Sequence, residues 1–165
     1  MPDGPVPEGK MPFAIRLATE ADIPALVALM TDFYAESNFV LPAAAATQTF
    51  DALFASPALG AVWLAEQTAA TVGHLVLAVS FSMEYGGLRD FIDDLYVRPS
   101  ARGRGAGAAL LTAAREGARA RGLRVLQAET GQATHLARPL YARAGYVDSG
   151  HALLTLPLAA PLHTV

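Results

Sequence analysis

An arginine- and glycine-rich loop between an apolar stretch and an alanine-rich stretch is the part of the sequence best suited to chemistry. It lies within residues 93–111, DDLYVRPSARGRGAGAALL, and carries Arg102 and Arg104 among three glycines. If a helix starts after the loop, its first backbone N–H groups have no helical partner, and its dipole adds about half a positive charge. Glycine lets such a loop approach a bulky ligand closely. The segment therefore predicts a phosphate or pyrophosphate site.

The loop also admits other interpretations. A P-loop is excluded, because the string GxxxxGK[ST] occurs nowhere in the chain. A dinucleotide fingerprint is matched by Gly103, Gly105 and Ala108, and Glu129 stands near the place of its ribose-binding acid. However, residues 98–102 separate the preceding strand from the first glycine, and only 36 residues follow Glu129 to complete a sheet. A glycine-rich connection with solvated arginines is the remaining alternative.

The composition favours one globular, soluble domain. The chain has 165 residues, of which 53% are hydrophobic and 16% charged, which is typical of a packed domain rather than a disordered segment. The net charge of -3 gives no reason to expect nucleic acid or an anionic membrane as a partner. No apolar run approaches the ~20 residues of a membrane span. We expect residues 1–11 to form a flexible leader and residues 12–165 a single cytoplasmic domain.

The chain contains no cysteine and four histidines. The lack of cysteine excludes disulfides, thiolate metal sites and a cysteine nucleophile. The histidines show no metal-ligand spacing such as HExxH, so we predict no metal site and expect surface or structural roles for them. They are His74, His135, His151 and His163.

Apolar periodicity and turn residues predict the elements that position the loop. Three alternating stretches separated by turns indicate an antiparallel meander. The helix after the loop links two strands, which should therefore be parallel and joined by a right-handed crossover. The predicted order is β-α-α-β-β-β-α-β-α-β. Strands are expected at 13–17, 61–66, 72–81, 90–97, 123–128 and 151–156, and helices after Thr19 and at 44–55, 106–121 and 134–144.

Two motifs in the right order resemble those of the GNAT N-acetyltransferases. The string at 102–107 has the form R-x-x-G-x-G/A and follows Leu-Tyr-Val at 95–97, like the family's motif A. The segment ARPLYARAGY at 137–146 is similar to the family's A-x-x-L-Y-x-x-x-G-F/Y segment, and the resemblance extends back to about Phe13. It implies an α/β GNAT fold, with a mixed central sheet, an antiparallel N-terminal meander and helices on both faces.

The resemblance implies acetyl-CoA as the acyl-donor cosubstrate. Backbone amides of the loop would hold the CoA pyrophosphate, and the strand before the loop would pair with the pantetheine arm. A splay between that strand and the strand at 123–128 would admit the arm. The residues to which the resemblance gives these roles are Leu95, Tyr96, Val97, Arg102, Gly103, Arg104, Gly105, Ala106, Gly107 and Ala108.

The resemblance also implies roles for three side chains in acetyl transfer. The reaction needs a neutral amine, donors for the developing oxyanion and a proton for the departing thiolate. Tyr141 takes the position of the tyrosine that many members use to protonate the thiolate. Asp93 takes the position of a glutamate proposed as the base in some relatives, including polyamine acetyltransferases, and Asp94 lies beside it. The alternatives are solvated or capping roles for the aspartates and plain packing for Tyr141.

The acceptor is expected to be a cationic primary amine of a small molecule or peptide. Glu84, Asp90, Asp93 and Asp94 suggest an acidic cluster, which a solvated face would also explain. Without a cysteine to carry an acyl group, the amine would attack directly in a ternary complex. The resemblance to the GNAT family also implies a homodimer. A non-catalytic acyl-CoA-binding module and a dinucleotide-binding protein are the alternatives.

Trp63 is expected in the core. The aromatic residues expected to pack there or border the acceptor channel are Phe33, Tyr34, Phe39, Phe81 and Tyr85.

Overall fold

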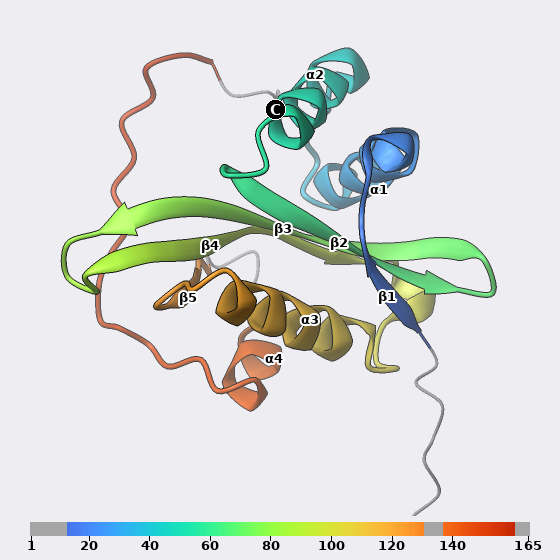
Figure 1. The fold of residues 1–165 in the computed structure, drawn as a ribbon. Helices are drawn as coiled ribbons and strands as arrows, with labels where there is room; N and C mark the ends of the chain where they lie inside the picture. The colour runs from blue at the N-terminus through green and yellow to red at the C-terminus, as the bar shows by residue number, and fades with distance from the viewer. Residues whose placement is uncertain (1–12, 131–136, 161–165) are drawn as a thin grey trace, which may run out of the picture.

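A five-stranded sheet crosses the middle of the molecule (Figure 1). The computed structural model describes residues 13–130 and 137–160, so the leader expected at 1–11 lies outside the described residues. The first four strands are antiparallel neighbours and the fifth runs parallel to the fourth, which confirms the predicted mixed sheet with its meander. In spatial and chain order the strands are β1 (Ala14–Leu17), β2 (Gly60–Gln67), β3 (Ala70–Ser82), β4 (Gly87–Val97) and β5 (Leu126–Ala128).

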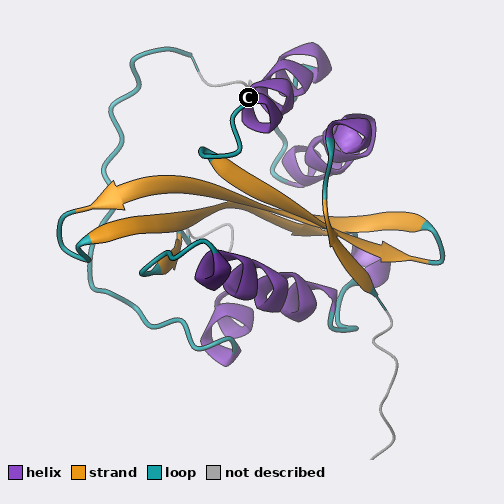
Figure 2. Cartoon of the chain, in the orientation of Figure 1, coloured by secondary structure: helices purple, strands orange, loops and turns teal. Residues whose placement is uncertain are grey.

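Helices cover both faces of the sheet, as predicted (Figure 2). The first two lie on one face, and the next two lie on the other. Each layer encloses an apolar core, one around Leu26, Leu64 and Phe50 and the other around Trp63, Leu75 and Leu110. The helices are α1 (Ile23–Glu36), α2 (Ala43–Ala55), α3 (Ala106–Ala120) and α4 (Arg138–Arg143), with 3-10 turns η1 (Glu20–Asp22) and η2 (Pro99–Ala101).

The sequence of α1 explains how its last turn reaches the end of β4. Leu26, Leu29 and Met30 are buried on one face at helical spacing. The helix ends shortly before Asn38, whose φ of 59° lies in the left-handed region that stops a helix. Glu36 therefore occupies the final turn, beside the loop that follows β4.

The sequence of α3 fixes how closely this helix lies on the sheet. Leu110 and Ala114 are fully buried against it, and Gly122 ends the helix with a φ of 74°. Gly117 faces Trp63 of β2, and a Cβ atom on this glycine would lie only 2.5 Å from Trp63 Cζ2. The indole therefore fits against the bare backbone of α3, which confirms the core role expected for Trp63.

Three elements differ from their predicted extents. β5 is shorter than the strand predicted at 123–128. α4 covers only part of the helix predicted at 134–144, of which residues 134–136 lie outside the described residues. The last strand, predicted at 151–156, is not formed. Leu154 and Leu156 there are 92% and 81% exposed. Alternation suggested a strand, but a strand also requires a paired edge and a buried face, and this segment has neither.

Candidate active site

A β-bulge in β4 brings two aspartates to one place. Asp93 has no partner on β3, because its neighbours Ile92 and Asp94 pair with consecutive residues of that strand. A bulge of this kind re-aims the side chains next to it. The pKa of Tyr34 on α1 is raised to about 12, chiefly by burial and also by the charges of Asp94 and Asp93. Both carboxylates therefore lie close to the α1 side of the sheet.

The edge of β4 that faces β5 becomes free at the same bulge. β5 pairs with Asp90, Phe91 and Ile92, and within the described residues this pairing goes no further. The other edge of β4 stays paired with β3 as far as Val97. Backbone groups that point to this edge at 93–96 are thus available to an extended ligand, in the manner of an added strand, whereas the carbonyl oxygen of Val97 already accepts a hydrogen bond from Arg102. The pairing stops where the sequence predicted a splay.

The free edge leads to a glycine-lined helix start. Gly103 and Gly105 have φ values of 70° and 95°, which L-residues with a side chain rarely adopt. A Cβ atom at either position would meet no atom within 4 Å, so the space beside them is open. α3 begins at Ala106, and the N–H groups of its first turn have no helical partner. The loop and the helix start can therefore hold an anion such as a pyrophosphate.

Arg102 is tied to α1 rather than free beside the loop. Its Nε donates a hydrogen bond to the carbonyl oxygen of Val97 at 2.7 Å, and its Nη2 donates to both carboxylate oxygens of Glu36. The guanidinium also lies over the Tyr96 ring, 5.5 Å from its centroid. Arg102 and the hydroxyl of Tyr96, which donates to Glu36 at 3.0 Å, hold the pKa of Glu36 below its ordinary value. No sequence pattern points to Glu36, because 66 residues separate it from Arg102.

Arg104 extends toward a different part of the molecule. Its Nη1 donates to Oε1 of Gln67 on β2 at 3.4 Å, and its guanidinium lies 5.9 Å from the centre of the Phe13 ring. This single long hydrogen bond holds Arg104 less firmly than the carboxylate holds Arg102. Arg104 is therefore the loop arginine with the more available charge.

The two sequence motifs meet where α4 packs on the start of α3. A Cβ atom on Gly107 would lie 3.0 Å from Cδ2 of Leu140, so the glycine makes room for α4. The next residue, Tyr141, is buried, and its ring lies edge-on to that of Tyr146 with 5.1 Å between the centroids. Burial raises the pKa of Tyr141 to about 12, and the charge of Asp94 adds to the effect. The tyrosine therefore stays protonated at neutral pH and can donate a proton.

The two aspartates differ in their surroundings. Asp94 is only 8% exposed, and its charge reaches Tyr34 on α1 as well as Tyr141 on α4. Asp93 reaches the surface, yet burial of its carboxyl group raises its pKa, and the charges of Asp94 and Glu129 raise it further. The pair therefore offers one enclosed carboxylate and one that reaches solvent.

The wider acidic cluster expected from the sequence is not present. Glu84 is exposed in the turn between β3 and β4, far along the strand from the bulge. Asp90 is fully buried, and its charge interacts with Arg121 at the end of α3. Of these four acidic residues, only Asp93 and Asp94 lie together. An extended strand rises about 3.3 Å per residue, so residues several positions apart along it lie far from one another.

One buried histidine lies behind this aspartate pair. His74 of β3 is fully buried, and neither ring nitrogen has a hydrogen-bond partner. Its Nε2 lies 3.9 Å from Oδ2 of Asp94. His151 is exposed, whereas His135 and His163 lie outside the described residues. Within the described part of the chain, no three metal-ligating side chains gather in one place.

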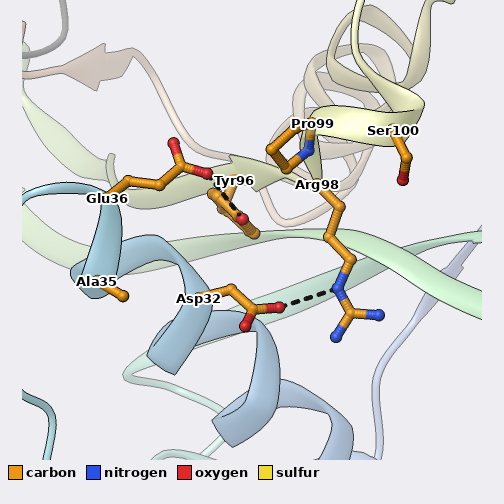
Figure 3. Close-up of a pocket in the computed structure, with 7 residues that line it drawn as sticks. All are labelled: Asp32, Ala35, Glu36, Tyr96, Arg98, Pro99 and Ser100. Carbon is orange, nitrogen blue, oxygen red and sulfur yellow. Dashed lines mark hydrogen bonds and ion pairs between the residues drawn. The ribbon is translucent and has the colours of Figure 1, made fainter.

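An open pocket of about 570 Å³ lies between the end of α1 and the turn after β4 (Figure 3). The hydroxyl of Tyr96 donates to Glu36 there, and Nε of Arg98 donates to Asp32 at 3.0 Å. Both carboxylates in the pocket are therefore already paired. It adjoins the Arg102 contact rather than the free edge of β4. Its walls are Asp32, Ala35, Glu36, Tyr96, Arg98, Pro99 and Ser100.

The aromatic side chains near α1 lie partly where the sequence predicted them. Phe33 and Tyr34 are half-buried at the core under α1, and the ring centroid of Phe33 is 5.4 Å from that of Tyr96. Phe81 is 64% exposed near the far end of β3 and lines no part of the region around the bulge.

Among the described residues, no helix is both long enough and apolar enough to cross a membrane.

The mixed sheet with helices on both faces is the fold of the GNAT acetyltransferases. The family model of the GNAT acetyltransferases matches residues 25–146, and the chain belongs to this family. Among curated proteins, no relative matches significantly.

Solved structures share the fold over nearly the whole chain. The integron cassette protein HFX_CASS3, from the mobile metagenome of Cole Harbour Salt Marsh, is 46% identical, with 90% of this chain and 92% of that chain covered and a TM-score of 0.84. A predicted acetyltransferase with acetyl-CoA from Clostridium acetobutylicum is 22% identical, with coverages of 87% and 96% and a TM-score of 0.72. The aminoglycoside N-acetyltransferase AAC(6')-Iy in complex with CoA is 15% identical, with coverages of 93% and 99% and a TM-score of 0.78.

Proposed function

We propose that this protein transfers the acetyl group of acetyl-CoA to a primary amine. One observation carries the proposal: the free edge of β4 at 93–97 runs from an aspartate pair to the helix start at Ala106. An acyl-CoA has a polar arm that can pair with such an edge and a pyrophosphate that suits such a helix start. The family membership and the relatives with acetyl-CoA and CoA support this assignment.

Backbone groups do most of the binding in this proposal. The edge residues Leu95, Tyr96 and Val97 pair with the pantetheine arm, and the thioester lies near the bulge. The amides of Gly103, Gly105, Ala106, Gly107 and Ala108 surround the pyrophosphate, where the glycines leave open space. Arg104 adds a positive charge, and Arg102 adds a second one once its ion pair with Glu36 is broken. A backbone N–H near Leu95 stabilises the oxyanion that forms on the acetyl carbonyl.

Asp93, Asp94 and Tyr141 carry out the proton transfers of the proposed reaction. A primary amine with a pKa near ~10.4 is mostly protonated at neutral pH, so a base must accept a proton before or during the attack. The pair Asp93 and Asp94 supplies that base and attracts the cationic amine. As the C–N bond forms and the C–S bond breaks, the Tyr141 hydroxyl protonates the leaving sulfur. The first proton of the ammonium form leaves to solvent, the second moves from nitrogen to the aspartate pair, and the leaving sulfur gains one from Tyr141. The enzyme returns to its initial state when the aspartate releases its proton to solvent and Tyr141 takes one up.

The chemistry excludes an acyl-enzyme on cysteine, since the chain has none. We therefore propose direct attack within a ternary complex. The homodimer and the cytoplasmic location expected from the sequence stay predictions, and light scattering of the purified protein measures the first.

Thermal unfolding with four ligands tests the cofactor. Acetyl-CoA and CoA at about 100 times their dissociation constants should each stabilise the protein by ~2.7 kcal/mol, whereas NAD and ATP should not. Stabilisation by NAD alone would show that the loop binds a dinucleotide. Thiol release from acetyl-CoA in a panel of primary amines then tests the transfer, and the lack of turnover with all of them would favour a non-catalytic acyl-CoA-binding module.

A further inference from the structure

His74 is a buried polar side chain that the proposed chemistry has not used. It lies in the middle of β3, paired with Leu64 of β2 and Tyr96 of β4. Directly paired residues project to the same face of a sheet, so His74 faces the core beneath α1. It is fully buried, and both of its ring nitrogens lack a hydrogen-bond partner. Such a group destabilises a fold, which makes a purely structural role costly.

The nearest ionisable partner of His74 is Asp94. Nε2 of the imidazole and Oδ2 of the carboxylate are 3.9 Å apart. This separation is too long for a hydrogen bond, but a shift of about 1 Å would bring it to the 2.7–2.9 Å of a charge-assisted one. The side chain of Asp94 is only 10% exposed, so the two groups meet where the charge of either acts strongly on the other.

Asp94 connects this buried pair to the centre of the proposed reaction. Its charge raises the pKa of Tyr141, the proposed proton donor on α4, and the pKa of Tyr34 on α1. The β4 bulge places it beside Asp93, at the point where the edge of β4 becomes free. The groups that face the pair are thus Tyr34 from α1, Asp93 and Tyr96 from β4 and Tyr141 from α4.

We propose that His74 is a positioning residue that acts through Asp94, and that Asp94 rather than Asp93 accepts the proton of the attacking amine. The inference rests on the proposed acetyltransferase function and assigns the base within it. His74 holds one carboxylate oxygen of Asp94 from behind and leaves the other for the amine. The N–H bond of the amine breaks as the C–N bond forms, and the proton moves to Asp94. That carboxylate then returns it to solvent, while Tyr141 reprotonates.

Two substitutions of His74 separate positioning from packing. His74→Gln keeps an N–H donor near the position of Nε2, whereas His74→Leu fills similar space without any donor. With the primary amine that is turned over fastest in the panel, His74→Leu should lower kcat at least tenfold, with the KM for acetyl-CoA unchanged. His74→Gln should restore most of the rate.

A measurement on the wild-type fold tests the pairing without any amine. In protein labelled with ¹⁵N-histidine, the ring signals of His74 should shift strongly in Asp94→Asn and little in Asp93→Asn, which removes the adjacent carboxylate. The exposed His151 serves as the internal control and should not respond to either substitution. This comparison holds even if His74→Leu fails to fold.

The outcomes distinguish this inference from the function on which it rests. If acetyl-CoA does not stabilise the wild-type protein, the proposed function fails. If acetyl-CoA binds and an amine is acetylated, but His74→Leu keeps the wild-type kcat or His74→Gln is as slow as His74→Leu, His74 is only a packing residue and the inference is overturned. Equal responses of His74 to the Asp93 and Asp94 substitutions would overturn it as well.

Discussion

Nη2 of Arg102 donates hydrogen bonds to both carboxylate oxygens of Glu36, at 2.6 Å and 2.8 Å. This contact joins the last turn of α1 to the loop proposed to hold the CoA pyrophosphate. A phosphate and the Glu36 carboxylate cannot both take the same guanidinium N–H groups. Binding of CoA must therefore replace this ion pair, or the anion must rely on the backbone and Arg104.

Removal of this competition should strengthen CoA binding. Glu36→Gln keeps the acceptor for the Tyr96 hydroxyl but removes the negative charge from Arg102. The pair is partly exposed, so its contribution is at most about 1 kcal/mol, and the dissociation constant of CoA should fall by up to about fivefold. Calorimetric titration measures this change. Asp32→Asn removes the neighbouring carboxylate that pairs with Arg98 and should have little effect. Weaker CoA binding in Glu36→Gln would contradict the competition.

A methyl group in the glycine cradle should block the anion. Gly105→Ala and Gly122→Ala both place a side chain at a positive φ, and neither new Cβ would meet an atom within 4 Å. Each should therefore destabilise the fold by about 1 kcal/mol through the backbone alone. Only Gly105→Ala, at the start of α3, should also weaken CoA binding at least tenfold. Equal CoA affinities in the two variants would show that the helix start does not hold the anion.

Tyr141 should act as a proton donor and not as a packing residue. Tyr141→Phe should lower kcat about 10²-fold at neutral pH, the lower end of general acid catalysis. The defect should shrink as the pH approaches ~8.5, where a thiolate leaves without help. Since the pKa of Tyr141 is raised to about 12, the wild type should lose no activity through its ionisation below pH 10. Tyr146→Phe removes the buried hydroxyl of the adjacent, half-buried ring and is the matched control. Similar losses in both variants would favour a packing role.

Gly117 should be required for the contact between α3 and the sheet. Alanine is favoured over glycine in a helix by about 1 kcal/mol, so Gly117→Ala would stabilise an exposed helix. Here the new Cβ would lie 2.5 Å from Trp63 Cζ2, and the clash should cost about 1–3 kcal/mol more than the helix gains. Urea unfolding measures the net loss. The double variant Gly117→Ala with Trp63→Phe should recover part of it, and a stabilised single variant would show that the indole can move aside.

Asp90 should make the fold less stable as the pH rises. Burial raises its pKa in the folded protein, and the charge of Arg121 offsets part of this shift. The folded state therefore binds the proton more tightly than the unfolded state, and stability falls as the pH rises from the unfolded pKa of ~3.9 through the higher folded value.

Asp90→Asn should abolish this part of the pH dependence. Relative to the wild type, the variant should gain on the order of 1 kcal/mol in unfolding free energy between pH 4 and pH 7. Urea unfolding at the two pH values measures the gain. Asp51→Asn, at an exposed position on α2, should leave the difference unchanged. If Asp90→Asn is less stable than the wild type at pH 7, the charge pair with Arg121 outweighs the burial of the carboxylate.

The sequence by itself determined the family, the mixed sheet and the position of the glycine-rich loop at the start of α3. These properties depend on local patterns: alternating apolar residues for strands, helical spacing for α1 and α3, and glycines where the backbone must take a positive φ. Gly103, Gly105 and Gly122 could be placed because only glycine adopts that conformation at low cost. Local patterns also predicted a final strand at 151–156, which is not formed, since this segment pairs with no strand among the described residues and its side chains are exposed.

The tertiary structure alone decided which charges meet. The Arg102–Glu36 pair joins residues 66 positions apart, and the pair of His74 and Asp94 depends on the register of β3 against β4 and on a one-residue bulge. A shift of one residue would turn every side chain of the strand to the other face. Burial and register arise only when separate elements pack together, so the spacing of residues along the chain revealed neither Glu36 nor His74.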